Sequence, residues 1–462
     1  PAGWTYATAL TTHKREGAHA DFADTSLETL IDSPVLAGAH VIETPLGDFD
    51  GAPMSIAVGA ETDTEARLTP EETGWLKNLV REEVALFGAR HFDHYVFLLT
   101  LSDAVAHFGL EHHQSSDDRL GGRTLVEKDR ASFDLGGLLA HESVHSWNGK
   151  YRRPAGLATG DYSTPMKGDL LWIYEGLTEY LGAVLTARSG SWTPEEARDD
   201  WAFIAEAMRN SRGRTWRPLA DTAVEAPLLY SSRMDGFARR RAVDFYYEGQ
   251  LLWLEVDTIL REKSGGKVSM DDFTHAFHGG KSGPPAVVPY TLEDVIKTLN
   301  TLAPNDWKAF FDKRIGEVND DAPLDGLTRA GWKLSYAAEP GPLFKSGEKV
   351  NERLDFRSSL GIVLAPEKMT VNDVVPGKPA ERAGIGPGVH LIGVNGRKVS
   401  PERLEQAIAD SVKSGKVELT YENADTLRTA TLDYKDGLKY PRLVRIEGTP
   451  DVLSEILKAH AK

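Results

Sequence analysis

The sequence predicts an α+β protein with several domains. Segments 54–58 and 94–101 are rich in β-branched and aromatic residues, which is typical of strands. Between them, Thr69 followed by Pro70 supplies an N-cap and a first-turn proline, and together these residues open a helix. The chain has 462 residues, of which 41% are hydrophobic. This length corresponds to two or three domains of about 150 residues each, with enough apolar residues for packed cores.

The helix that begins at Thr69 is expected to end near Phe87, so that residues 41–190 form an α/β subdomain. Segment 108–113 follows the second strand. We expect it to end the sheet as an edge strand, where an extended peptide could bind by main-chain pairing.

The central motif is His141-Glu142-x-x-His145. If the motif lies on a helix, the two histidines project from the same face one turn apart and can bind one metal ion. Glu142 would then reach a metal-bound water and act as its general base. The alternative is a chance placement of these residues on a polar helix.

A catalytic zinc ion takes three protein ligands and keeps one position for water. Segment 170–180 offers Glu175 as the third ligand, with Glu179 one turn further along the same face. Glu179 would accept a hydrogen bond from the second ring nitrogen of a ligating histidine, which fixes the tautomer and the ring orientation. The alternative, a solvated carboxylate at Glu175, is disfavoured by its apolar neighbours.

Two runs carry a family resemblance: H-E-x-x-H-x-W-N-x-K-x-x-R-P at 141–154, and D-L-L-W-x-x-E-G-x-T-x-Y at 169–180. Together they resemble the glycyl aminopeptidases, metallopeptidase family 61, from about Trp4 to the C-terminus. The resemblance implies a thermolysin-like (gluzincin) catalytic domain with a small sheet and a helical subdomain. It also implies one Zn²⁺ per chain, and peptide substrates with a free N-terminus and a small first residue, glycine or alanine.

Glu111 is the predicted amine-binding residue. The family pattern G-G-L-E-H is matched here by Gly109, Leu110, Glu111 and His112, whereas Phe108 replaces the first glycine. A carboxylate beside the metal recognises a free α-ammonium through charge-assisted hydrogen bonds. Two alternatives are a surface carboxylate and a second metal site, the latter suggested by the neighbouring histidines.

Tyr246 is the predicted oxyanion donor. In related gluzincin aminopeptidases, a tyrosine three residues before a glycine donates a hydrogen bond to the tetrahedral oxyanion, and Tyr246 stands in that place before Gly249. The alternative is that Tyr246 and Tyr247 are core aromatic residues.

The last third of the chain resembles a PDZ domain. Ser359-Leu-Gly-Ile362 is similar to its carboxylate-binding loop, and residues 402–414 are similar to the helix that lines its groove. A peptide C-terminus is therefore a possible ligand, and a packed domain that binds nothing is the alternative.

Residues 340–350, rich in Gly, Pro and Lys, are expected to be a linker. The predicted domains are a remnant of an N-terminal β domain at 1–40, the α/β catalytic subdomain at 41–190, a helical subdomain at 191–340, the PDZ-like domain at 345–440 and a C-terminal tail or helix at 441–462.

Composition excludes several other classes of function. The net charge of −16 opposes binding to nucleic acid. The absence of cysteine excludes disulfides and thiolate metal sites. No apolar run approaches the roughly 18 residues of a membrane span. The chain begins at Pro1 without methionine, which predicts a processed or truncated form; the compartment is left open, with export slightly favoured. Two further hypotheses are a zinc endopeptidase and a PDZ-based peptide-binding protein with a relic metal site.

Overall fold

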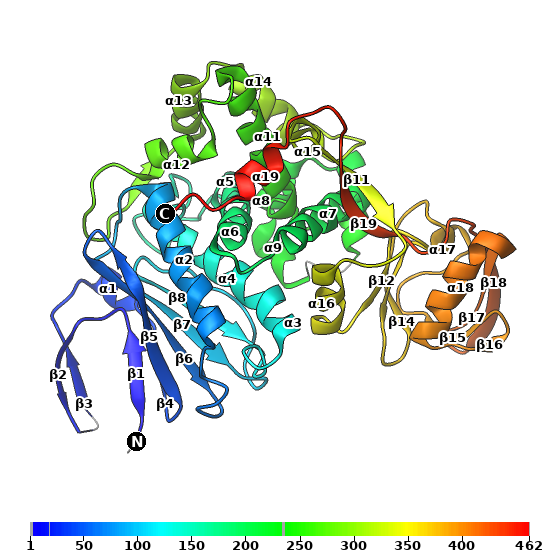
Figure 1. Cartoon of the computed structure of the whole chain (residues 1–462), viewed down its shortest axis with the longest axis horizontal. Coiled ribbons are helices and arrows are strands. Elements are labelled where there is room, and N and C mark those ends of the chain that lie inside the picture. The colour runs from blue at the N-terminus through cyan, green and yellow to red at the C-terminus, as the bar shows by residue number, and fades with distance from the viewer. Residues whose placement is uncertain (1–2, 18, 233–235, 462) are drawn as a thin grey trace. The chain divides into compact units, whose positions relative to one another are not determined.

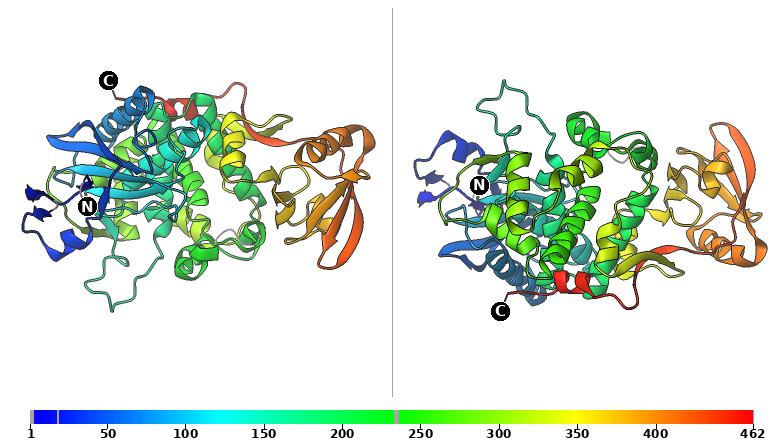
Figure 2. Two further views of the ribbon diagram at one scale, coloured as in Figure 1. Left: turned by 90° about the horizontal axis from the view of Figure 1, so that it is seen from below. Right: turned by 90° about the horizontal axis from the view of Figure 1, so that it is seen from above.

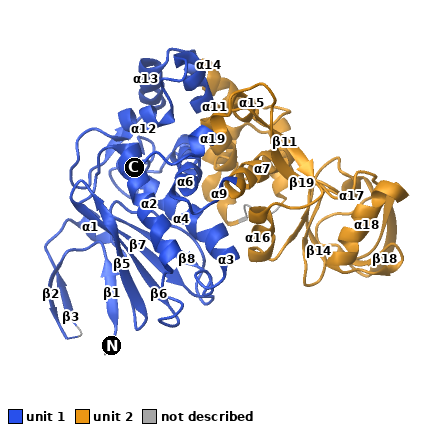
Figure 3. Cartoon of the chain, viewed as in Figure 1, with its two compact units in different colours: residues 1–194, 256–308, 454–462 blue, residues 195–255, 309–453 orange. Residues whose placement is uncertain are grey.

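The computed structural model describes residues 3–17, 19–232 and 236–461. The chain forms two compact units (Figure 3). The first unit comprises residues 1–194, 256–308 and 454–462, and the second comprises 195–255 and 309–453. The chain therefore enters and leaves each unit more than once.

The main sheet of the first unit has the strand order β5-β6-β7-β8. β5 and β6 form an antiparallel pair, whereas β6, β7 and β8 run parallel. α2 (Pro70–Phe87) connects β6 to β7 and begins with a capping box between Thr69 and Glu72. The two strands and the capped helix predicted from the sequence are confirmed. The bounds of the strands are Val41–Phe49, Ala52–Ala60, Tyr95–Leu101 and Ser115–Leu120, in chain order.

The segment predicted to be an edge strand pairs with β8. The N–H of Phe108 donates to the carbonyl of Arg119 and the reverse bond also forms; the same exchange joins Leu110 to Asp117. The pairing is antiparallel. Residues 108–112 therefore extend the sheet beyond β8.

Three helices position the candidate metal ligands: α4 (Gly136–His145) carries both histidines, and Glu175 lies between α5 (Leu171–Tyr174) and α6 (Gly176–Ser189). α4 packs against α6 and against β8, and α2 packs against α6 (Figure 1). A Cβ atom at Gly182 of α6 would lie 3.2 Å from the Cα of His141. The absent side chain lets α6 lie close behind the metal-binding face of α4.

The chain between α4 and α5 forms a long loop. Residues 160–167 are exposed, and Figure 2 shows this loop projecting from the body of the unit. The loop accounts for the long separation between the two histidines and Glu175.

The N-terminal residues form small sheets around a short helix. β1 (Thr5–Thr8) pairs with β4 (Val35–Gly38), and β2 (Thr12–Glu16) pairs with β3 (His19–Phe22). α1 (Leu27–Ile31) lies between β3 and β4 in the sequence and is capped by Ser26.

In the second unit, α7 (Pro194–Asn210) and the start of α11 (Tyr247–Ser264) belong to the helical part. β11 (Trp332–Ala337) pairs antiparallel with β19 (Tyr440–Arg445). The PDZ-like sheet lies in the sequence between these two strands, and α18 (Pro401–Ser414) contributes to its core. It is therefore an insertion between paired strands.

The PDZ-like sheet has β13 (Ile362–Ala365) paired on both edges. β12 (Leu354–Phe356) pairs with it on one side, and β14 (Thr370–Val374) pairs with it on the other. The N–H groups of Ser359 and Gly361 in the expected carboxylate-binding loop donate to the carbonyl of Phe356. A peptide strand that pairs with β13 would have to displace β12.

The expected linker at 340–350 is instead a helix, α16 (Pro342–Val350). Pro342 stands in its first turn, where proline favours helix formation. Leu343 is buried, and the ring of Phe344 packs edge-on against Phe203 and Tyr440, with ring centroids 6.2 and 5.5 Å away. Composition alone concealed this apolar helix face.

Among the described helices, none combines the length and apolar character that crossing a membrane requires.

Candidate metal centre

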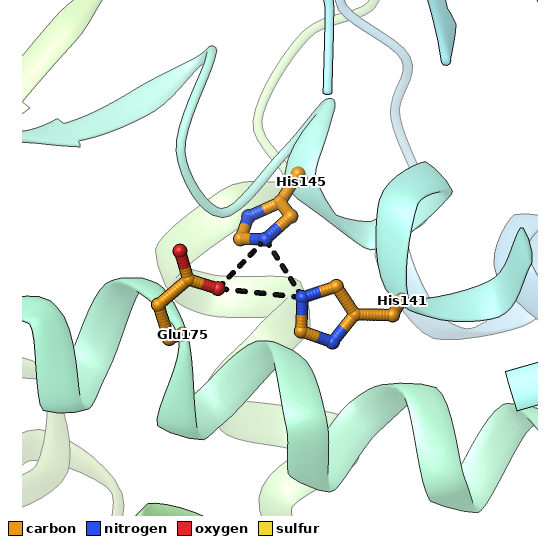
Figure 4. Close-up of side chains that lie close together, drawn as sticks. All are labelled: His141, His145 and Glu175. Atoms are coloured by element: carbon orange, nitrogen blue, oxygen red, sulfur yellow. Dashed lines mark hydrogen bonds and ion pairs between the residues drawn. The ribbon is translucent and has the colours of Figure 1, made fainter. Parts of the chain in front are cut away.

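Three side chains of the first unit converge on one point (Figure 4). Nε2 of His145 lies 3.1 Å from Nε2 of His141, and Oε2 of Glu175 lies 3.3 and 3.2 Å from Nε2 of His141 and His145. Two imidazole nitrogens and a carboxylate oxygen are the donors of many catalytic zinc sites. The donor set and its convergence therefore fit a zinc ion.

Hydrogen bonds on the outer side orient both imidazole rings. Nδ1 of His141 lies 2.8 Å from Oε2 of Glu179, and Nδ1 of His145 lies 2.9 Å from the carbonyl oxygen of Asn148. When each Nδ1 carries the proton, each Nε2 presents its lone pair to the centre. The placement of Glu179 agrees with the orienting role predicted for it.

Asn148, three residues beyond the end of α4, bonds to α5 and α6, the two helices on either side of Glu175. Its amide nitrogen donates to the carbonyl oxygens of Ile173 and Tyr174, at 2.9 and 3.1 Å, and to the hydroxyl of Thr178 at 3.0 Å. Sequence reasoning assigned Asn148 no role, although it lies in the first motif run. The only sequence feature that could have indicated its role is its position three residues after His145, close enough to contact that histidine.

Without a metal ion, the opposite charges of the centre favour protonated histidines and an ionised Glu175. Burial alone would lower the pKa of His141 and His145. The carboxylate of Glu175 outweighs burial and raises the pKa of both histidines, and Glu179 adds to the rise at His141. Burial alone would raise the pKa of Glu175, but the two histidines lower it to about 2. A bound cation would replace these protons, because the ligands must be deprotonated to bind a metal.

Glu142 lies against the edge segment. Its side chain is buried at 6% exposure, and its carboxylate forms no hydrogen bond with any residue that the structure describes. A Cβ atom at Gly109 would come within 2.1 Å of Oε1 of Glu142. Burial raises the pKa of Glu142 to about 7. The carboxylate is thus free to accept a proton, and a larger residue at position 109 would force the Glu142 side chain to shift.

Glu111 is joined to the residue beside a metal ligand. The hydroxyl of Tyr174 donates a hydrogen bond to Oε1 of Glu111, and the Tyr174 ring lies 4.8 Å from that of His145. Leu110, the remaining predicted substrate-binding residue, is 46% exposed. The structure therefore brings Gly109 against Glu142 and Glu111 against Tyr174, which precedes the candidate ligand Glu175, with Leu110 between them in the edge segment.

The second metal site suggested by the neighbouring histidines receives no support from the described residues. His112 contacts Asp32, with its Nδ1 3.1 Å from Oδ1, and Nε2 of His107 lies 3.0 Å from the carbonyl of Ser102. Within the described ranges, the triad of Figure 4 is the one cluster of three or more His, Asp or Glu ligand atoms close enough to share an ion.

Tyr246 belongs to the second unit, whereas the metal ligands belong to the first. It directly precedes α11, and its ring centroid lies 4.9 Å from that of Phe245. Tyr247 contacts Phe203, at a centroid separation of 6.5 Å. The oxyanion role of Tyr246 stays a prediction.

Comparisons with known proteins agree with the motifs. Residues 134–252 match the sequence model of the M61 glycyl aminopeptidase family, and residues 349–422 match that of the PDZ domain. No protein with a curated description matches the chain by sequence. The family match identifies the chain as a peptidase, a hydrolase of peptide bonds.

One solved structure shares the fold, and others are more weakly similar. An aminopeptidase N family protein from Idiomarina loihiensis has a TM-score of 0.75 at 20% identity, over 99% of this chain and 77% of its own. An M1 zinc metallopeptidase from Deinococcus radiodurans has a TM-score of 0.44 at 15% identity, over 70% of this chain and 64% of its own. Leukotriene A4 hydrolase from Saccharomyces cerevisiae has a TM-score of 0.40 at 16% identity, over 69% and 45%. The predicted mixed fold is confirmed by the first of these.

Proposed function

We propose that this chain, which carries an M61 glycyl aminopeptidase domain and a PDZ domain, is a zinc aminopeptidase that releases small N-terminal residues, glycine or alanine, from peptides. One observation carries the proposal: the histidine–glutamate triad lies beside a carboxylate suited to an α-ammonium, Glu111, which Tyr174 holds in place. The preference for small residues rests on the family resemblance.

His141, His145 and Glu175 would hold one zinc ion, which when bound polarises the substrate carbonyl and acidifies the attacking water. Glu142 accepts the proton of that water and returns it to the leaving amine. Glu142 is buried, and burial raises its pKa, which favours its taking up a proton and then returning it.

Two further residues act on the substrate. Glu111 accepts charge-assisted hydrogen bonds from the free α-ammonium, and this places the first carbonyl carbon at the reacting centre. Tyr246 donates its hydroxyl hydrogen to the developing oxyanion, an interaction typically worth about 3 kcal/mol in the transition state.

The decisive experiment combines metal analysis with turnover of glycyl, alanyl and leucyl anilides. We expect one zinc per chain, faster turnover of the glycyl and alanyl substrates, loss of activity on chelation and recovery with added zinc. Full activity in chelated, metal-free protein would contradict the proposal. Equal turnover of all three anilides would contradict only the preference for small residues.

An endopeptidase is the second candidate, because the same metal chemistry serves both reactions. Product analysis separates the two, since an aminopeptidase releases residues stepwise from the N-terminus, whereas an endopeptidase cuts internally. A PDZ-based binding protein with a relic site is disfavoured by the intact ligand set and base.

For the PDZ domain we propose a peptide C-terminus as ligand, which would require displacement of β12 from β13.

A further inference from the structure

The segment beside the metal centre has an inner and an outer edge. The main-chain groups of residues 108, 110 and 112 point to β8 and bond there. Successive residues of a strand alternate in direction, so those of Gly109, Glu111 and His113 point to the outer edge. This outer edge is where an extended peptide could pair.

The outer edge is open at two positions and filled at the third. The main-chain N–H and C=O of Gly109 and Glu111 form no hydrogen bond with any described residue. At His113, by contrast, the N–H donates to Oδ2 of Asp32 at 2.8 Å, and the carbonyl accepts from the hydroxyl of Ser146 at 2.7 Å. The open part of the outer edge therefore ends at His113, two residues after Glu111.

Asp32 is fixed firmly in this position. Besides the His113 N–H, it accepts a hydrogen bond from Nζ of Lys150 at 2.6 Å and contacts Nδ1 of His112 at 3.1 Å. Burial would raise its pKa, but the hydrogen bond from His112 and the charge of Lys150 hold the pKa well below its usual range. The carboxylate thus stays charged and bonded at the pH at which a peptidase works.

We infer that Asp32 closes the peptide-binding edge directly beyond Glu111, and that this closure excludes substrate residues upstream of the free N-terminus. The inference rests on the proposed aminopeptidase function and adds a specificity-determining residue to it. A substrate can pair with Gly109 and Glu111 while its ammonium meets the Glu111 carboxylate. An upstream residue would need the groups of His113, which Asp32 and Ser146 already occupy.

Space for such an extension exists behind the closure. A cavity of about 270 Å³ lies against Asp32 and His113, with Ser26, Ser33 and Pro285 among its lining residues. The buried Nδ1 of His113 has no hydrogen-bond partner among the described residues. Removal of the Asp32 side chain would connect the outer edge to this space and would free the His113 N–H for pairing with an upstream residue.

The test compares Asp32→Ala and Asp32→Asn with the wild type on two substrates: alanyl anilide and N-acetyl-alanyl anilide. Asp24→Ala is the matched control, because Asp24 is exposed and only eight positions away. For Asp32→Ala, we expect the ratio of turnover on the blocked substrate to turnover on the free substrate to rise at least about tenfold. Zinc content should be unchanged. Asp32→Asn keeps an oxygen for the His113 N–H but loses the ion pair with Lys150, so its ratio should rise less.

A wild-type ratio in folded, zinc-loaded Asp32→Ala would overturn the inference. If that variant does not fold, an unchanged ratio in Asp32→Asn would overturn it instead. Mass spectrometry of a longer peptide supplies a second readout, since loss of the closure should add internal cuts to the stepwise products. A wild-type protein that hydrolyses neither anilide would contradict the proposed function itself, which keeps the two failures distinct.

Discussion

The hydroxyl of Tyr174 donates a hydrogen bond to the carboxylate of Glu111, which lies 63 residues earlier in the chain. Tyr174 directly precedes the metal ligand Glu175, and a Cβ atom at Gly149 would lie 2.8 Å from its ring. The tyrosine is therefore packed rigidly between the metal centre and the proposed amine-binding group. It leaves the second oxygen of Glu111 for the substrate ammonium.

Replacement of Tyr174 by phenylalanine should weaken amine binding. Without the hydroxyl, the Glu111 carboxylate loses its fixed orientation, and hydrogen bonds to charged groups are worth about 1.5–3 kcal/mol. We expect KM for alanyl anilide to rise about tenfold, with a smaller change in kcat and no loss of zinc. Tyr162→Phe, at an exposed position, is the control. A change in kcat alone would speak against a role in amine binding.

Replacement of Glu142 by glutamine should abolish turnover while zinc is retained. An amide cannot accept the proton of the attacking water, and loss of a general base typically costs about 100-fold or more. The variant keeps the side-chain volume, so the packing beside Gly109 is preserved. Metal analysis and kcat are measured on the same sample, and retained turnover would remove Glu142 from the mechanism.

Replacement of Gly109 by alanine should also lower kcat. The new methyl group would stand 2.1 Å from Oε1 of Glu142, so the carboxylate must move, and a displacement of about 1 Å can cost about 100-fold in rate. Gly160→Ala is the matched control, because a Cβ atom there meets nothing within 4 Å. Equal activity of the two variants would show that Glu142 tolerates the shift.

Replacement of Glu179 by glutamine should weaken zinc binding. The carboxylate orients His141 through a 2.8 Å contact with its Nδ1, and loss of such a partner typically lowers metal affinity by about 10–100-fold. Competition with a chelator of known affinity measures the change. Glu71→Gln, on the exposed side of α2, should retain wild-type affinity, and the same loss in both variants would make the effect nonspecific.

Glu348 should make the stability of the second unit depend on pH. Its Oε1 accepts a hydrogen bond from the N–H of Asp355 at 2.6 Å. Burial raises the pKa of Glu348 from 4.5 to about 7, and the negative charges of Asp355 and Glu405 act in the same direction. The hydrogen bond and the positive charge of Arg353 oppose the rise. Because the folded state binds this proton more tightly, the stabilisation is complete below about pH 4.5 and is lost as the pH rises through about 7.

Glu348→Gln should therefore flatten the dependence of Tm on pH. The unfolding free energy of the wild type should fall relative to that of the variant between pH 4.5 and 7.5, by up to about 3 kcal/mol. Thermal melts across this range supply the measurement, with the exposed Glu339→Gln as the control. Parallel curves for wild type and Glu348→Gln would contradict the assignment.

The candidate metal ligands were within reach of the sequence because their geometry is local. A spacing of four residues on a helix dictates that His141 and His145 share a face, and the second motif run indicated Glu175. The edge segment at Glu111 followed from the strand before it. In each case, a short stretch of chain determines the arrangement.

The remaining features depend on contacts between distant segments. No local pattern indicates that Asp32 reaches the main chain of His113, 81 residues further on. The helix at 342–350 was concealed by its Gly, Pro and Lys content, although Phe344 packs against aromatic rings of the same unit.

The last residues of the chain rejoin the catalytic body after the PDZ-like insertion. The N–H groups of His460 and Ala461 donate to Glu82, and Nε of Arg188 donates to the carbonyl of Ile456. A fragment that stops ahead of β12 would leave β11 without its partner strand and Nε of Arg188 without the Ile456 carbonyl. Dissection of this enzyme thus calls for excising the inserted module and splicing β11 to β19, so that the tail is preserved.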